Sequence, residues 1–215
     1  MTVEIIQGEG HVEAGAVAGD RPFASLRRDH YHVILADPPW SFKTWSHRGQ
    51  GRGASQHYQT MATADIAALP VAELAAKDCV LFLWGIWPLL PDTLGVIASW
   101  GFTYKTCGFV WIKQKARAAT LWADLDNLFM GLGYGTRGNS EFCLRASRGA
   151  PKCRAHDVPQ LILAPRRQHS RKPDEQYALI ERLYGGPYVD LFARSRISGW
   201  DSWGDQDGMF AEASG

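Results

Sequence analysis

Short apolar segments recur along the chain, and segments with apolar residues at helical spacing lie between several of them. The apolar segments are rich in β-branched and aromatic residues, a pattern typical of buried strands. They predict six strands, at residues 32–36, 79–84, 103–112, 140–145, 160–164 and 188–193. Helices are predicted at residues 63–78 with an interruption at Pro70, at 89–101, and at 172–186 with Pro173 in the first turn and Gly185 at the end.

The alternation of strands and helices predicts an α/β fold with a mostly parallel sheet. The strands are apolar on both sides, so helices are expected to cover both faces of the sheet. We expect one domain over residues 1–215, with about 18 residues at the N-terminus and about 7 at the C-terminus peripheral to it. Sheets of this kind bind ligands beyond the carboxyl ends of their strands. The first predicted strand ends directly before residues 37–40, which read DPPW.

The DPPW segment combines a carboxylate, two prolines and an indole at this strand end. Pro38 and Pro39 lack backbone N–H donors and have fixed φ angles, so the corner is rigid and its polar groups are mostly acceptors. The Asp37 carboxylate and the Pro38 carbonyl can each accept one N–H from an exocyclic amine and so make its nitrogen nucleophilic. Trp40 would offer a flat face for an extruded base. A turn that buries Trp40 is the structural alternative.

The composition excludes several classes of protein. With 23 Lys and Arg residues against 22 Asp and Glu residues, the formal net charge is +1, so any binding of nucleic acid must come from local patches. The four cysteines form no CxxC pair and have no paired His nearby, so neither a zinc site nor a disulfide framework is expected, and no other metal is implied. No apolar run approaches the length of a membrane span, which predicts a cytoplasmic protein.

Three long segments interrupt the alternation and are predicted to be loops: residues 41–61, 113–139 and 147–158. The first two mix cations with aromatic residues, and they include Lys43, Tyr58 and Arg137. This mixture suits the phosphates and bases of a nucleic acid, although a solvated glycine-rich loop has a similar composition.

Several separate blocks resemble, in order, the family of the eukaryotic mRNA N6-adenosine methyltransferase catalytic subunit and its bacterial and phage DNA adenine methyltransferase relatives. The blocks are DPPW at 37–40, VLFLWG at 80–85, FVWIK at 109–113, GTRGNSEFCL at 135–144, HSRKPDEQYALIERL at 169–183, VDLFAR at 189–194 and GWDSWGDQ at 199–206. The resemblance extends over residues 20–208. It implies a Rossmann-like fold and methyl transfer from S-adenosylmethionine to the 6-amino group of adenine.

The resemblance also implies roles for single residues of this chain. The catalytic corner would consist of Asp37, Pro38, Pro39 and Trp40. The cofactor would contact Asp20 at its adenine end, Asp37, Lys172 at its methionine carboxylate, and Arg194, Asp205 and Gln206 at its ribose. The nucleic-acid substrate would contact Lys43, Tyr58, Arg137 and Glu141.

The chain departs from the family pattern at its C-terminal end. Arg196 and Ile197 stand where relatives of the mRNA enzyme have His-Asn, and we place them outside the site. Asp205 stands where these relatives have Asn, and its carboxylate can accept hydrogen bonds from ribose hydroxyls. No glycine-rich cofactor fingerprint follows the VDLFAR block, which argues against a nicotinamide-dependent enzyme.

The sequence therefore predicts a site-specific, adenine-specific DNA methyltransferase of prokaryotic or phage origin. DNA is favoured over RNA because the chain is compact and its GWDSWGDQ block resembles prokaryotic members. An RNA adenine-N6 methyltransferase is the first alternative. A catalytically silent nucleic-acid-binding or regulatory subunit of the same fold is the second, against which the intact DPPW and Lys172 argue. A protein partner or a homodimer is compatible with each of these functions.

Overall fold

The computed structural model describes residues 22–41, 60–115, 125–131, 133, 135–167 and 171–204. Their elements are β1 (Tyr31–Ala36), α2 (Thr63–Ala68), η2 (Val71–Glu73), β2 (Ala75–Gly85), η3 (Trp87–Leu89), α3 (Leu90–Ser99), β3 (Thr103–Gln114), η4 (Leu125–Asn127), β4 (Ser140–Arg148), β5 (Leu161–Pro165), α4 (Glu175–Leu183), β6 (Tyr188–Leu191) and β7 (Trp200–Trp203). Among the described residues, no helix is long and apolar enough to cross a bilayer.

The seven described strands form one sheet in the order β5-β3-β4-β2-β1-β6-β7. β1 pairs in parallel with both β2 and β6. β6 also pairs in parallel with β7, and β3 pairs in parallel with β5. β4 alone runs in the opposite direction, because it is antiparallel to both of its neighbours, β2 and β3. The predicted mostly parallel sheet is therefore confirmed.

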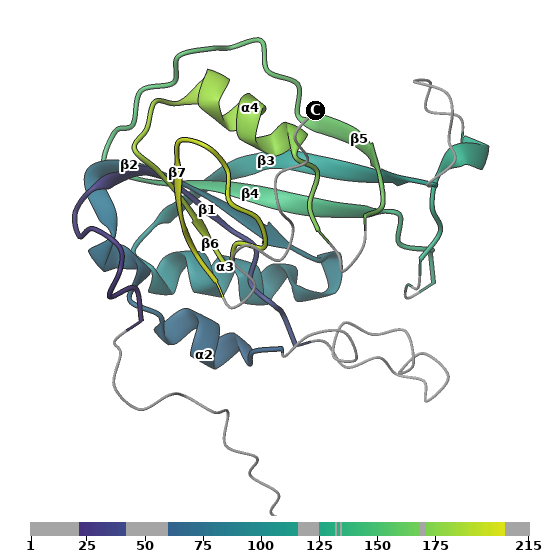
Figure 1. The fold of residues 1–215 in the computed structure, drawn as a ribbon. Helices are drawn as coiled ribbons and strands as arrows, with labels where there is room; N and C mark the ends of the chain where they lie inside the picture. The colour runs from purple at the N-terminus through teal and green to yellow at the C-terminus, as the bar shows by residue number, and fades with distance from the viewer. Residues whose placement is uncertain are drawn as a thin grey trace, which may run out of the picture.

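Helices cover both faces of the sheet, with α4 on one side and α2 and α3 on the other (Figure 1). The side chains of β1 alternate between the two cores. Val33 and Leu35 belong to the core that includes Ile180 of α4, whereas Ile34 belongs to the core that includes Ile97 of α3. This burial on both faces explains why the strand reads as a continuous apolar run.

Two helices differ from their predicted bounds next to a proline. The helix predicted over residues 63–78 is six residues long, because Leu69 is extended before Pro70 and β2 already begins at Ala75. Pro173 lies before α4, which begins at Glu175. Strand β7 was missed as an element, since its four residues follow a loop and pair with β6 at the edge of the sheet.

Candidate active site

Two neighbouring parallel strands, β1 and β6, bring their carboxyl ends together at one edge of the sheet. Asp37 directly follows β1, and its backbone N–H donates to the Leu191 carbonyl at the end of β6 over 3.3 Å. β1 has β2 on one side and β6 on the other, so the order of the strands reverses at this point. A reversal of this kind opens a crevice for ligands in doubly wound sheets.

The chain turns sharply after β6, which brings Arg194 to the same edge. Phe192 has a φ of 65°, in the left-handed region that few non-glycine residues adopt. The backbone N–H of Ala193 then donates to the Trp203 carbonyl of β7 over 3.0 Å. The turn is therefore fixed to the sheet by β7.

The reversed direction of β4 places Glu141 near this edge. Because β4 runs against its neighbours, its first residues lie beside the last residues of β3, where Trp111 is the partner of Glu141 in the ladder. Lys113, two residues further along β3, donates from Nζ to Glu141 Oε1 over 2.5 Å. Glu141 thus lies at the carboxyl ends of the parallel strands, the same end of the sheet as Asp37.

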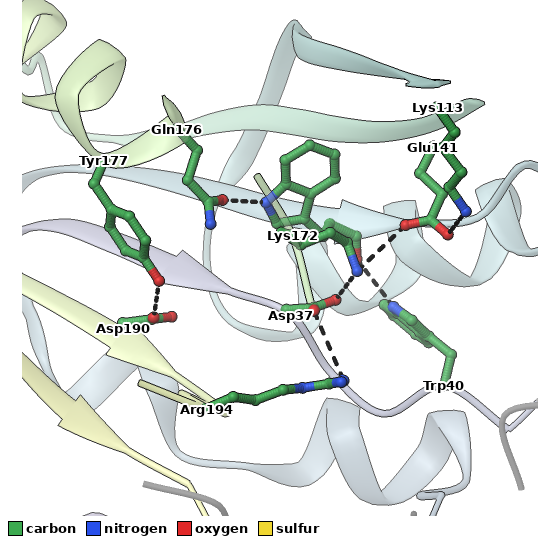
Figure 2. Close-up of polar contacts among 10 residues, drawn as sticks. Asp37, Trp40, Lys113, Glu141, Lys172, Gln176, Tyr177, Asp190 and Arg194 are labelled. Carbon is green, nitrogen blue, oxygen red and sulfur yellow. Dashed lines mark hydrogen bonds and ion pairs between the residues drawn. The ribbon is translucent and has the colours of Figure 1, made fainter. Parts of the chain in front are cut away.

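Lys172, in the segment before α4, lies between these two carboxylates (Figure 2). Its Nζ donates to Asp37 Oδ1 over 2.7 Å and lies 3.3 Å from Glu141 Oε2. A guanidinium nitrogen of Arg194 lies 3.9 Å from the other carboxylate oxygen of Asp37. Three cations and two carboxylates therefore alternate along the row Lys113, Glu141, Lys172, Asp37 and Arg194.

Burial strengthens this row of charges. The side chains of Lys172, Glu141 and Asp37 are only 9%, 11% and 17% exposed. Burial alone would raise the pKa of Glu141, but Lys172 and Lys113 outweigh it and hold that pKa below its ordinary value. Burial alone would lower the pKa of Lys172, but Asp37 and Glu141 raise it above its ordinary value. Both groups are therefore ionised at neutral pH.

The DPPW corner is fixed by hydrogen bonds on both sides. The Pro38 carbonyl accepts the backbone N–H of Trp40 over 2.8 Å, and the Pro39 carbonyl accepts that of Met61 over 2.9 Å. The indole N–H of Trp40 donates to the Trp84 carbonyl over 2.9 Å, and the residue is 7% exposed. In the structure Trp40 thus anchors the corner to β2, and stacking of a base on its face stays a prediction.

A second set of polar contacts joins α4 to the sheet behind Asp37 (Figure 2). Gln176 accepts the indole N–H of Trp84 over 2.7 Å, and the hydroxyl of Tyr177 donates to Asp190 over 2.8 Å. These side chains line one pocket together with Asp37, Lys172 and Arg194 of the charged row. Its walls are Leu35, Asp37, Trp84, Arg171, Lys172, Asp174, Gln176, Tyr177, Asp190, Phe192, Ala193, Arg194 and Ser195.

Residues 31–206 of the chain match the model of the MT-A70 family. The chain belongs to the MT-A70 family. It is 33% identical over 206 residues to the Type II methyltransferase M.MunI of a Mycoplasma species. The match covers 86% of this chain and 81% of that relative. The predicted family and the Rossmann-like methyltransferase fold are thereby confirmed.

Other MT-A70 relatives are longer proteins. The chain is 29% identical over 180 residues to a putative N(6)-adenosine-methyltransferase MT-A70-like of Medicago truncatula, covering 82% of this chain and 26% of the relative. It is 24% identical over 205 residues to the N6-methyladenosine RNA methyltransferase MTA1 of Cryphonectria parasitica, covering 89% of this chain and 56% of the relative. The chain thus spans most of the bacterial relative but about a quarter of the plant relative.

The site residues expected from the MT-A70 resemblance fall into three groups in the structure. Asp37, Glu141, Lys172 and Arg194 come together in the charged row, and Pro38, Pro39 and Trp40 form the corner beside it. Arg137 is exposed in the segment before β4. Asp20, Lys43, Tyr58, Asp205 and Gln206 lie outside the described residues, so their roles stay predictions.

The residues missed as site residues include Lys113, which pairs with Glu141, and Gln176, Tyr177 and Asp190, which line the pocket. The sequence held a signal for Asp190, since a carboxylate within an apolar strand needs a polar partner. Lys113 was predicted to begin a loop, although it lies within β3. Its pairing with Glu141 depends on the antiparallel register of β3 and β4, which no local pattern predicts.

Among the described residues, no group of His, Cys, Asp and Glu side chains is arranged to hold a metal ion. What the site offers instead is one carboxylate at a rigid corner, with cations on both of its sides and an acceptor carbonyl next to it. Such an arrangement can accept N–H hydrogens and bind a zwitterionic ligand.

Proposed function

We propose that the chain transfers a methyl group from S-adenosylmethionine to the 6-amino group of adenine in DNA. The observation that carries the proposal is the position of Asp37. Its carboxylate stands at a rigid proline corner, at the point where the strand order reverses, and is ion-paired to Lys172 at 2.7 Å. A DNA substrate also favours an intracellular location.

The pocket beside Asp37 fits the amino-acid end of S-adenosylmethionine. A zwitterion needs a cation for its carboxylate and acceptors for its ammonium group. Lys172 supplies the cation, Asp37 supplies an acceptor, and Arg194, which the resemblance assigns to the ribose, also lines the pocket. The bound cofactor would supply an electrophilic methyl group on its sulfonium.

Asp37 and the Pro38 carbonyl orient the adenine amine in this proposal. The Pro38 oxygen accepts one bond from Trp40 in the structure, and a carbonyl oxygen has a second lone pair for an N–H of the substrate. Asp37 accepts the other N–H, so the nitrogen lone pair leaves conjugation with the ring and faces the methyl group. The new N–C bond would form as the methyl–sulfur bond of the sulfonium breaks, with neutral S-adenosylhomocysteine as the leaving group. Asp37 would pass the surplus proton on nitrogen to water.

DNA is proposed as the substrate because the Type II methyltransferase M.MunI is similar to this chain over 81% of its length. The GWDSWGDQ block, which resembles prokaryotic DNA adenine methyltransferases, favours the same substrate. RNA is the second candidate, because the relative of Cryphonectria parasitica is named as an RNA methyltransferase and matches 89% of this chain.

Labelled S-adenosylmethionine and matched DNA and RNA oligonucleotides test the substrate. Each nucleic acid is offered single-stranded and double-stranded, and its nucleosides are separated after digestion. We expect label in N6-methyladenine from DNA. Label only in RNA would move the proposal to the second candidate, and label in another nucleoside would overturn adenine as the acceptor.

Calorimetry with S-adenosylmethionine tests the cofactor separately from turnover. Lys172→Met removes the proposed partner of the methionine carboxylate, so we expect binding to weaken by about 1.5–3 kcal/mol, the range for a hydrogen bond between charged groups. Lys105→Met removes an exposed lysine of β3 and serves as the control. Equal affinity of the wild type and Lys172→Met would exclude Lys172 from the cofactor site.

A further inference from the structure

We propose that Lys113 is a positioning residue for methyl transfer, which acts through Glu141 on Lys172 and so on the catalytic carboxylate of Asp37. The inference rests on the proposed function and adds to it a residue that does not contact either substrate. It also assigns Glu141 a role in the placement of Lys172.

Lys113 is held in place by its backbone as well as by its charge. Its N–H donates to the Asn139 carbonyl over 2.9 Å, and its own carbonyl accepts the N–H of Phe129 over 2.8 Å. Its side chain is 17% exposed, and Nζ lies 2.5 Å from Glu141 Oε1 and 5.0 Å from the centre of the Trp111 ring. The ammonium therefore has a fixed position beside Glu141.

The two carboxylate oxygens of Glu141 interact differently with Lys113 and Lys172. Oε1 accepts a hydrogen bond from Lys113, whereas Oε2 lies 3.3 Å from Lys172 Nζ without hydrogen-bond geometry. Lys172 is therefore attracted to Glu141 by charge, and its 2.7 Å hydrogen bond goes to Asp37. The position of Lys172 between the two carboxylates depends on the negative charge of Glu141.

The charged groups that face Glu141 come from four parts of the fold. Lys113 approaches from β3 and Lys172 from the segment before α4, and beyond Lys172 lie Asp37 after β1 and Arg194 after β6. Burial favours the neutral acid form of Glu141, and the two lysines oppose it. Without Lys113, Lys172 is the one cation among the described residues left to keep the buried carboxylate ionised.

Loss of the Glu141 charge would change the competition for Asp37. Lys172 would then have one carboxylate instead of two, and its ammonium would be drawn fully to Asp37. That ammonium would compete with the adenine amine for the same acceptor, so turnover would fall while the binding of the nucleic acid would not. Because protonation of Glu141 causes the loss, a higher pH should restore turnover.

The pH profile of kcat on adenine oligonucleotides tests this role, with four proteins compared: the wild type, Lys113→Met, Lys113→Arg and Lys105→Met. We expect the acid limb of Lys113→Met to lie about 1 pH unit or more above that of the wild type, because an adjacent opposite charge lowers the pKa of a carboxyl by about 1–3 units. The KM for the oligonucleotide should stay the same. Lys113→Arg should restore the wild-type profile, and Lys105→Met should not change it.

Glu141→Gln provides a second test if Lys113→Met folds poorly. In a Glu141→Gln background residue 141 carries no carboxyl to titrate, so Lys113→Met should cause no further shift of the acid limb. An unshifted Lys113→Met profile, even with uniformly lower turnover, would overturn the positioning role, and so would a shift that persists with Gln at residue 141. A wild-type chain that methylates no adenine would instead overturn the proposed function, and the role of Lys113 with it.

Discussion

The Nζ of Lys172 lies 2.7 Å from Oδ1 of Asp37, although 135 residues separate the two in the chain. Asp37 follows the first described strand, and Lys172 precedes the last described helix. The pair forms because β6, which follows that helix, returns to pair with β1. The candidate active site is therefore complete only when both halves of the sheet have assembled.

Lys172→Met should destabilise the fold. The substitution leaves Asp37 and Glu141 as two nearby carboxylates that lose their shared cation in a buried site. Removal of one partner of a buried pair costs about 3 kcal/mol or more. In a chain of this size that corresponds to a fall of roughly 6–12 °C in Tm, measurable by thermal unfolding.

A double variant separates lost charge from lost packing at this position. Lys172→Met with Glu141→Gln removes one cation and one carboxylate, so the site loses no net charge, and part of the lost stability should return. The effect of Glu141→Gln on the free energy of unfolding is compared in the wild type and in Lys172→Met. If it lowers stability by the same amount in both, the two residues are not coupled.

The stability of the fold should fall on the acid side because of Glu141. Its pKa in the folded chain lies below the ordinary value of 4.5, so its ionised form stabilises the fold at every pH above that value. This contribution is lost as the pH falls from about 4.5 through the lower pKa of the folded chain. Glu141→Gln should therefore flatten the dependence of unfolding free energy on pH in that window, as measured by urea unfolding at several pH values. An unchanged slope would mean that the pKa of Glu141 is the same in the folded and unfolded chains.

Arg137 should contribute to nucleic-acid affinity without contributing to the choice of base. It is exposed in the segment that leads to Glu141, where a cation can contact phosphate. Arg137→Gln should weaken binding to all oligonucleotides alike and reduce the slope of log K against log salt by about 1. Arg28→Gln, which removes an exposed arginine paired with Glu73, is the control. A change confined to one oligonucleotide sequence would contradict a phosphate contact.

The sequence allowed the sheet and the corner to be predicted because both have local signals. The apolar run of β1 and the prolines after it fix the element and its end. Asp37, Glu141, Lys172 and Arg194 could be chosen because each lies in a block that resembles the family, and the structure brings all four together.

What could not be predicted depends on pairing between distant strands. The position of Lys113 beside Glu141 follows from the reversed direction and the register of β4, and β7 forms because β6 offers it an edge. The hydrogen bond from the indole N–H of Trp40 to the Trp84 carbonyl at the end of β2 also joins distant parts of the chain. Such partners are set by the tertiary fold and leave no local pattern in the chain.

The catalytic role of Asp37 is tested most directly by nucleoside analysis of DNA after incubation of the wild type and Asp37→Asn with labelled cofactor. Asn keeps the shape of the side chain but lacks its charge and can present a donor to the amine. We predict N6-methyladenine with the wild type and a loss of at least about 100-fold with Asp37→Asn, the scale for one interaction made in the transition state. N6-methyladenine formed by Asp37→Asn at a rate near that of the wild type would contradict the central claim that this carboxylate activates the amine.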